Sequence, residues 1–328
     1  MRRVSVAVIG LGRMGTHHAR VLADLEGARL SGVADASREA RARYRAPAGV
    51  EVYEDHRSLF DRERPDAVVI AVPPALHREV ACAAMERGAH VLVEKPIALR
   101  RDDALAIVAA ASARGVKLMV GHVERFNPAV VELKRRLGAG ELGRVWKLHA
   151  RRLLPLPARV ADVGVALDLA LHDIDAMLHL TEGRIVRAYG ETSRAPHATC
   201  EDALSGLLRF STGEIGVLDV SRRSPKKLRE LSVLGEGGAL VVDYLAQDLR
   251  WIRSERTDET WERTTHFPPS AETLETAKTE PLRAELAAFV RAIALDEAPP
   301  VTGEDGVAAV QVALDLVLSG IEGRPIER

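Results

Sequence analysis

The sequence predicts an α/β protein with two domains: a doubly wound, parallel sheet first, and then an α+β domain with a mostly antiparallel, open sheet. Its 328 residues are enough for about two domains of ~150 residues each. Residues 1–122 alternate short apolar runs with helical patterns, as parallel sheets covered on both faces do. Residues 123–328 instead join strand-length runs through tight turns, which favours antiparallel pairing.

The strands expected in the first domain are continuous apolar runs, so both of their faces should be buried. They are Val4–Ile9, Arg29–Ala34, Ala67–Val72, Ala89–Val93 and Lys117–Val120. Helices are expected between them, over His18–Leu25, Leu76–Arg87 and Asp102–Arg114. This alternation predicts one sheet with helices on each side.

The second domain shows strand patterns and two late helices. Strands are expected at Trp146–Leu153 and within residues 184–192, 202–223 and 228–244. Ser211–Glu214 and Glu236–Gly238 have the composition of hairpin turns. Helices are expected near residues 282–294 and 305–319, where they can pack back on the first domain. Residues 253–276 are polar and poorly patterned, which indicates a loop or edge strands.

Composition excludes several classes of partner. The formal net charge is −1, so no global field recruits nucleic acid or an anionic membrane. Cys82 and Cys200 are far apart in the chain, which fits a reducing compartment without a disulfide framework. No apolar run reaches the ~20 residues of a membrane helix, and the apolar start is interpreted as a strand rather than a signal peptide. We therefore expect a cytoplasmic protein that acts on a small molecule.

A glycine loop follows the first expected strand and opens a helix. The spacing is Gly10-x-Gly12-x-x-Gly15. Gly10 permits a tight turn, Gly12 lets the backbone approach a pyrophosphate, and Gly15 allows the helix to pack on the strand. The helix N-terminus, with Arg13 and Met14, would then face phosphate charge. In this context the motif predicts a dinucleotide-binding Rossmann domain over residues 1–122.

The next strand ends in Asp35, about 20 residues beyond the loop, where an acidic residue binds the ribose diol of a dinucleotide. Its carboxylate would accept from both hydroxyls of NAD and would repel the 2′-phosphate of NADP. Arg38 lies close by and offsets part of that repulsion. The alternative for Asp35 is a helix N-cap, and the two roles are compatible.

The stretch from Val91 to Pro96, VLVEKP, ends an apolar strand on a charge pair. Ligands bind beyond the carboxyl ends of strands in a doubly wound sheet, so Glu94 and Lys95 should lie at the cleft. Lys95 there would hold a substrate oxygen or shuttle a proton, and Glu94 would orient it or contact the nicotinamide end. The alternative is a salt-bridged strand end.

The N-terminal GLGRMG, the EKP at 94–96 and the antiparallel second half resemble the Gfo/Idh/MocA oxidoreductases. The resemblance covers essentially the whole chain and is densest in AVPPALHREVACAAMERGAHVLVEKPIAL, residues 71–99. It implies that Lys95 is catalytic. It also implies that Pro73 and His77 belong to the cofactor-binding set.

The family also carries an aspartate and a histidine four residues apart on a helix, which here implies Asp168 and His172. The periodicity agrees, because these two share a polar stripe with Asp175 and His179. His172 would be a general base near neutral pH, and Asp168 would fix its tautomer or hold a substrate hydroxyl. The alternatives are a solvated face or a metal site. We expect no metal, because no third cluster of ligands is visible.

Four further residues are candidates for substrate binding. Arg125 and Asn127 lie at the domain junction; their alternatives are a surface charge and a cap on the helix that starts at Pro128. Arg151 and Arg152 point to opposite faces of a strand, so only one of them can easily reach a given ligand. Arg152 or the loop residue Arg159 would hold a phosphate bidentately, and the alternative for Arg159 is solvent exposure.

Together these features predict an NAD-dependent sugar oxidoreductase, with NADP the less favoured cofactor. The similarity to members that act on UDP-N-acetylated sugars implies hydride transfer from C3 of a UDP-N-acetylhexosamine. The alternatives are a free polyol or monosaccharide dehydrogenase of the inositol type, and a non-catalytic NAD(P)-binding sensor. Residues 123–328 would bind the substrate and form a homodimer or homotetramer, because an open antiparallel sheet needs cover on one face.

Overall fold

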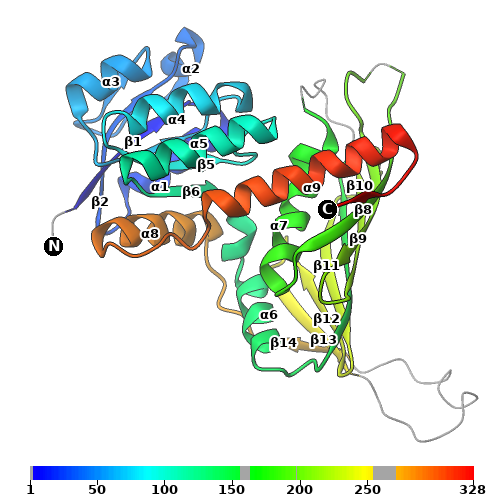
Figure 1. Cartoon of the computed structure of the whole chain (residues 1–328). Coiled ribbons are helices and arrows are strands. Elements are labelled where there is room, and N and C mark those ends of the chain that lie inside the picture. Colours follow the sequence, from blue (N-terminus) through cyan, green and yellow to red (C-terminus); the bar gives the residue numbers. More distant parts are fainter. Residues whose placement is uncertain (1–2, 156–162, 197, 254–270) are drawn as a thin grey trace, which may run out of the picture. The chain divides into compact units, whose positions relative to one another are not determined.

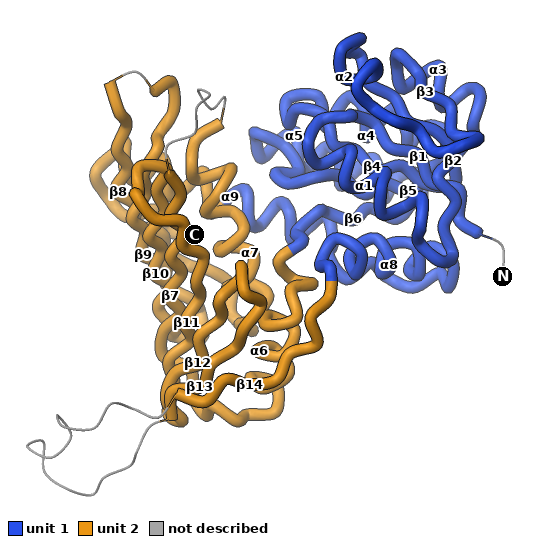
Figure 2. The backbone as a smooth tube through the Cα atoms, turned by 180° about the vertical axis from the view of Figure 1, so that it is seen from behind, with its two compact units in different colours: residues 1–123, 280–311 blue, residues 124–279, 312–328 orange. Residues whose placement is uncertain are grey.

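The computed structural model describes residues 3–155, 163–196, 198–253 and 271–328. These residues form two compact units, which are coloured separately in Figure 2. Unit 1 contains Met1–Val123 and Glu280–Gln311, and unit 2 contains Glu124–Thr279 and Val312–Arg328. Arg159 lies outside the described residues. In the described ranges no helix is both long and apolar enough to cross a membrane.

Unit 1 is built on a six-stranded parallel sheet with the order β3-β2-β1-β4-β5-β6. Its strands are β1 Val4–Ile9, β2 Ala28–Ala34, β3 Glu51–Tyr53, β4 Ala67–Ile70, β5 His90–Glu94 and β6 Leu118–Gly121. The order reverses between β1 and β4, and the carboxyl ends of strands at such a reversal form the binding edge of this fold. The predicted doubly wound sheet is therefore confirmed.

Helices cover both faces of this sheet. They are α1 Arg13–Ala23, α2 Arg38–Arg43, α3 His56–Glu63, α4 His77–Met85, α5 Arg101–Arg114, α8 Pro281–Ala294 and the start of α9 Gly303–Glu322. Helix α8 packs on α1 and β1, whereas α4 packs on α5, β4 and β5. The prediction for α1 began too late, at His18, because it followed the apolar run; the helix starts at Arg13, directly behind Gly12. Strand β3 was missed because it is a three-residue edge strand without an apolar run.

Unit 2 is built on a nine-stranded sheet with the order β14-β13-β12-β11-β7-β10-β9-β8-β15. Its strands are β7 Val145–Leu153, β8 Ile185–Ser193, β9 Ala203–Phe210, β10 Ile215–Ser221, β11 Leu228–Gly235, β12 Gly238–Asp243, β13 Asp248–Arg253, β14 Ala271–Leu274 and β15 Ile326–Glu327. Neighbouring strands are antiparallel, apart from the parallel pair β7–β10. The mostly antiparallel sheet is confirmed, and both predicted hairpin turns join neighbouring strands.

One face of the unit 2 sheet carries helices, as Figure 1 shows for α6 Pro128–Gly138 and α7 Leu171–Leu180. Alternate residues of β7 turn to this face, so Arg152 is buried while Arg151 is half-buried on the opposite face. That opposite face bears large apolar side chains: Leu207, Ile215 and Leu234 are 51%, 36% and 41% exposed. The strand alternation thus gives one packed face and one open face.

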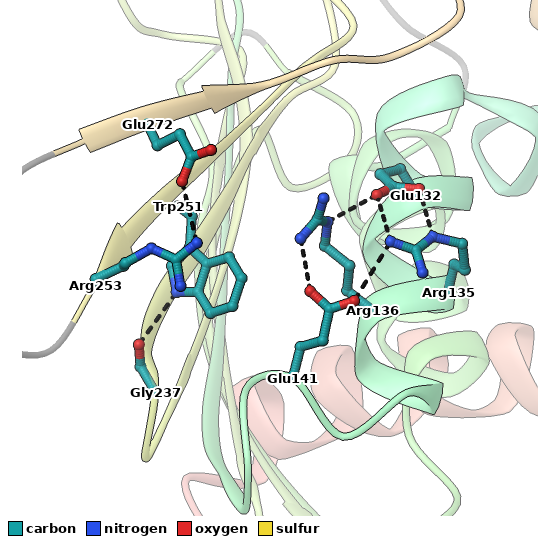
Figure 3. A network of polar contacts seen from close by, with 8 residues as sticks. All are labelled: Glu132, Arg135, Arg136, Glu141, Gly237, Trp251, Arg253 and Glu272. Carbon is teal, nitrogen blue, oxygen red and sulfur yellow. Dashed lines mark hydrogen bonds and ion pairs between the residues drawn. The ribbon is translucent and has the colours of Figure 1, made fainter.

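Trp251 of β13 and Arg136 near the C-terminal end of α6 are both labelled in Figure 3, with the polar contacts around each of them. The guanidinium of Arg253 lies 3.8 Å from the centre of the Trp251 ring, and that of Arg136 lies 5.7 Å from it. Arg136 also pairs with Glu132 and Glu141 at 2.7 and 2.6 Å. The contact of Arg136 with the Trp251 ring joins α6 to β13, and the ion pairs with Glu132 and Glu141 hold the Arg136 guanidinium in place.

Candidate active site

The glycine loop of unit 1 has the geometry that a dinucleotide-binding turn requires. Gly10 adopts φ +98°, and a Cβ there would lie 2.5 Å from the carbonyl oxygen of Ala71. A Cβ on Gly15 would lie 1.8 Å from the carbonyl oxygen of Gly10, so α1 can approach the loop this closely only with glycine. A Cβ on Gly12 would meet no atom of the other described residues within 4 Å, its two chain neighbours aside. The space beside the Gly12 backbone is therefore open to a pyrophosphate.

The loop borders a cavity of about 570 Å³ at the carboxyl ends of β1, β2 and β4. Its lining includes Gly10, Gly12, Asp35, Ser37, Pro73 and Leu76. Arg13 and Met14 stand beside it in the first turn of α1, the former exposed and the latter half-buried. The size and the mixed lining of this cavity suit a dinucleotide.

Asp35 is held at the end of β2 by two backbone N–H groups. Oδ2 accepts from Leu11 at 2.6 Å, and Oδ1 accepts from Ser37 at 2.7 Å. The N-cap of α2 is Ser37, so Asp35 supports the turn before the helix and is not its cap. Arg38 is exposed and is not among the described residues that line the cavity. The Asp35 carboxylate is one of several that line the cavity, and its place at the end of β2 suits the diol of NAD.

Glu94 ends β5 and is 8% exposed. Its Oε1 lies 2.7 Å from His18 Nε2, and its Oε2 accepts from the Lys95 backbone N–H at 3.1 Å. Burial raises the pKa of the Glu94 carboxyl, but the hydrogen bond from His18 and the neighbouring Lys95 charge outweigh burial and lower it. A carboxylate thus stands directly before Lys95.

His77 contacts the turn after β5 at Pro96, the residue that follows Lys95. Its Nδ1 lies 2.9 Å from the Pro96 carbonyl oxygen, and its Nε2 lies 2.9 Å from that of Val72. The residue has no exposed surface. His77, predicted as a cofactor contact, therefore joins two backbone segments at the edge of the cavity. Burial lowers the pKa of His77, and the two carbonyl bonds offset this only in part.

Unit 2 supplies the other candidate catalytic residues, on a helix with an irregular start. Ala166–Ala170 form a π-helical turn that contains Asp168, and α7 follows with His172 as its second residue. The prediction of a regular α-helical stripe is therefore wrong here, because a π turn widens the helix and changes its phase. Such turns are frequent at functional sites.

The start of this helix is capped from a distant segment. Glu201 accepts the Ala166 N–H at 3.1 Å through Oε1. Gly164 makes room for this carboxylate, since a Cβ there would lie 1.9 Å from Oε1. A negative charge at a helix N-terminus is favourable.

Asp168 forms an ion pair with Arg222, a residue that the sequence analysis did not identify. Arg222 also donates to the carbonyl oxygen of Val163 at 2.9 Å. The Arg222 side chain is 9% exposed, whereas that of Asp168 is 40% exposed. The carboxylate is therefore held in place and still accessible.

Arg152 does not lie where a diphosphate could reach it easily. It is 1% exposed, and its guanidinium forms two bonds to Asp173, at 2.7 and 3.0 Å, and one to Glu124 at 3.3 Å. Burial disfavours its charge, but Asp173 and Glu124 outweigh burial and raise the pKa of Arg152. Its predicted role as a phosphate ligand is replaced by one in the interior of unit 2.

Arg125 and Asn127 also turn inward. Arg125 pairs with Asp175 through bonds of 2.6 and 2.9 Å, and both side chains are buried. Asn127 accepts from the Ala129 N–H at 3.2 Å, which caps α6, and donates to the Tyr244 carbonyl oxygen at 3.1 Å. Arg125 is therefore not a surface charge. Asp175, which the periodicity placed on the stripe of His172, belongs to the core.

Among the described residues no group of three or more His, Cys, Asp or Glu side chains is arranged to hold a metal ion. The candidate catalytic groups of the two units are a lysine ammonium, an imidazole and carboxylates. Unit 1 carries the dinucleotide cavity and the lysine, and unit 2 carries the histidine and a carboxylate; each of these groups by itself suits one part of hydride transfer with acid–base assistance.

Comparison with known proteins identifies the family. Residues 4–122 match the family described as "Oxidoreductase family, NAD-binding Rossmann fold", and residues 130–241 match the "GFO/IDH/MocA C-terminal domain". The UDP-N-acetylglucosamine 3-dehydrogenase of Acidithiobacillus ferrooxidans is 31% identical over 301 residues, which are 90% of each chain. The chain belongs to the Gfo/Idh/MocA oxidoreductase family. The predicted resemblance is therefore confirmed, and this family member is a dehydrogenase whose cofactor is NAD.

Other members of the Gfo/Idh/MocA family are comparably similar. Inositol 2-dehydrogenase 1 of Saccharopolyspora erythraea is 32% identical over 333 residues, which are 99% of this chain and 96% of the relative. A solved levoglucosan dehydrogenase in complex with NADH and L-sorbose has a TM-score of 0.88 at 22% identity, covering 100% of this chain and 99% of the other. The last comparison shows the shared fold. Together they place the protein among NAD-dependent dehydrogenases of sugars and polyols.

Proposed function

We propose that this protein oxidises C3 of a UDP-N-acetylhexosamine and passes the hydride to NAD. The observation that carries the chemistry is the turn after β5, where a buried carboxylate and two buried histidines fix the backbone around Lys95. The similarity to a UDP-N-acetylglucosamine 3-dehydrogenase supports the choice of substrate.

In this reaction the Lys95 ammonium holds the reacting hydroxyl, and His172 takes its proton as general base. Bound NAD would supply the hydride acceptor; the carbinol carbon would lose a hydride and its hydroxyl a proton to His172, so that the alcohol becomes a ketone. Asp168 holds His172 or a sugar hydroxyl, and Arg222 keeps the Asp168 carboxylate in place. Arg159, outside the described residues, is the remaining candidate for the diphosphate.

A second candidate is the oxidation of a free polyol of the inositol type. One observation favours it. Arg152, one of the two predicted diphosphate ligands, instead forms hydrogen bonds to the buried carboxylates of Asp173 and Glu124. The similarity to an inositol dehydrogenase is as high as that to the nucleotide-sugar enzyme.

We also propose that the open face of the unit 2 sheet binds a second copy of this chain in the cytoplasm. Leu207, Ile215 and Leu234 lie on that face, and the register sets Ile215 and Leu234 on either side of Lys147. Exposed apolar patches of this kind mark interfaces. Light scattering should give at least a dimer mass, and Leu207→Glu should lower it; a monomeric wild type would overturn the assignment.

The substrate is tested by measuring NAD reduction with UDP-GlcNAc, UDP-GalNAc, myo-inositol and glucose at equal concentrations. The proposal predicts that a UDP-sugar gives the highest kcat/KM. Turnover of a free polyol without turnover of any UDP-sugar would establish the second candidate. Binding of NAD with no turnover of any compound in a wider sugar panel would support the sensor alternative.

A further inference from the structure

His18 is a buried polar side chain on the first helix of the dinucleotide fold. It has no exposed surface, and its neighbours Ala19, Val21 and Leu22 are buried apolar residues of the same helix. An imidazole in such surroundings costs free energy unless it makes a hydrogen bond. Its partner is Glu94, 76 residues further along the chain.

The surroundings of the ring select its tautomer. Nε2 lies 2.7 Å from Glu94 Oε1, whereas the buried Nδ1 has no hydrogen-bond partner among the described residues. A proton on Nε2 satisfies the carboxylate, and a second proton on Nδ1 would be a buried donor without an acceptor. Nε2 is therefore the ring nitrogen that donates to the Glu94 carboxylate.

The carboxylate of Glu94 is held at both oxygens. Oε1 accepts a hydrogen bond from His18 Nε2, and Oε2 accepts one from the Lys95 backbone N–H at 3.1 Å. Gly121 on the neighbouring strand leaves space for it, since a Cβ there would lie 3.2 Å from Oε2. The chain from His18 through Glu94 ends on the main chain of Lys95.

We propose that His18 is a positioning residue for Lys95 and acts through the Glu94 carboxylate. The proposal rests on the catalytic role of Lys95 proposed above. His18 fixes the orientation of the carboxylate, and the carboxylate fixes the backbone from which the lysine side chain extends. Its negative charge also stands beside the ammonium. His77 holds the Pro96 carbonyl, so both neighbours of Lys95 are restrained.

The variant His18→Leu removes the donor, and His18→Gln keeps a donor on a side chain of similar reach. With whichever substrate turns over, kcat of His18→Leu should fall roughly 10- to 100-fold, as expected for a misplaced catalytic group. The KM for substrate and the Kd for NAD should stay within about threefold, and His18→Gln should recover most of the loss. His17→Leu is the matched control, because His17 is the exposed neighbour on the same helix.

A double-mutant cycle tests whether His18 acts through Glu94. In a Glu94→Gln background, His18→Leu should reduce kcat by less than about threefold further, because the two residues act as one unit. Glu94→Gln also stands in if His18→Leu does not fold. Multiplicative losses of kcat in the cycle would overturn the proposal.

A second readout needs no substrate. Lysines are labelled with an amine-reactive ester, and the labelled peptides are quantified by mass spectrometry. With Lys134 of α6 as the reference, the labelling rate of Lys95 should change at least threefold in His18→Leu. The same rate should be unchanged in His17→Leu. An unchanged Lys95 rate in His18→Leu would contradict the positioning role. A changed rate with normal kcat in both His18→Leu and Lys95→Met would retain the positioning and refute the catalytic role of Lys95 instead.

Discussion

The two units hold their candidate catalytic residues by different means. In unit 1, Lys95 follows directly after a strand, and the restraints are hydrogen bonds to its own backbone and to the adjacent residues. In unit 2, the helix of His172 is held by buried ion pairs, Arg152 with Asp173 and Arg125 with Asp175. The arrangement around Lys95 buries one carboxylate, that of Glu94. The arrangement around α7 buries several charged side chains, each paired with one of opposite charge.

This difference has an energetic consequence. Removing one partner of a buried ion pair leaves an uncompensated charge and costs more stability than removing a neutral hydrogen bond. We therefore expect substitutions around Lys95 to affect mainly the rate, and substitutions around α7 to affect mainly the stability of unit 2.

The largest effect should come from the catalytic residues themselves. Lys95→Met and His172→Ala should each lower kcat roughly 10²- to 10⁴-fold, the range for losing a general acid or base. The Kd for NAD, measured by titration, should change less than twofold, because neither substitution touches the glycine loop. If His172→Ala keeps a normal kcat over the whole pH range, the base lies elsewhere and Lys95 is the first candidate.

The next effect concerns Asp173 in unit 2. Asp173→Ala leaves Arg152 buried and short of its main partner, so the free energy of unfolding should fall by about 3–5 kcal/mol in denaturant titration. The paired replacement Arg152→Met with Asp173→Leu should cost clearly less. Equal losses in the single and the paired variant would show that packing, rather than charge pairing, holds α7.

Much of unit 1 could be predicted because its signals are contiguous. Two short stretches each indicate both a structural element and a function. They are the glycine spacing from Gly10 to Gly15 and the strand that ends in Glu94 and Lys95. Parallel strands buried on both faces also leave continuous apolar runs. The edge strand β3 has no such run, and nothing in the sequence identified it.

The site in unit 2 could be predicted only in part. The asparagine and arginines that pair inward do so with residues 21 to 117 positions away, and periodicity cannot identify such partners. Strand alternation separated Arg151 from Arg152 correctly, but it could not say which face bears helices. The π turn at Asp168 also has no signature in an apolar repeat. His18 was missed because a histidine at a core position carries no sign of its partner.

A smaller effect is expected at the cofactor cavity. Asp35→Ser should reduce the preference for NAD over NADP by about 2–4 kcal/mol, because both the diol contacts and the repulsion of a 2′-phosphate are lost. The ratio of kcat/KM for the two cofactors measures it. A wild type that uses NADP as well as NAD would show that Asp35 does not select the cofactor.

The smallest effect is a pH dependence at Glu94. Its pKa is lowered in the folded protein, so ionised Glu94 contributes stability above its unfolded pKa of about 4.3 and loses it as pH falls through the folded pKa. The wild type should therefore exceed Glu94→Gln in unfolding free energy at pH 7, and the difference should shrink below about pH 4. A difference independent of pH would assign the effect to packing.

The proposed reaction moves a hydride from a sugar carbinol carbon to NAD, and a deuterium label follows that hydride. UDP-GlcNAc deuterated at C3 is incubated with the protein and NAD, and an aminotransferase removes the ketone. The account predicts deuterium in the NADH and accumulation of a 3-amino sugar. Turnover with the deuterium retained in the sugar would contradict oxidation at C3.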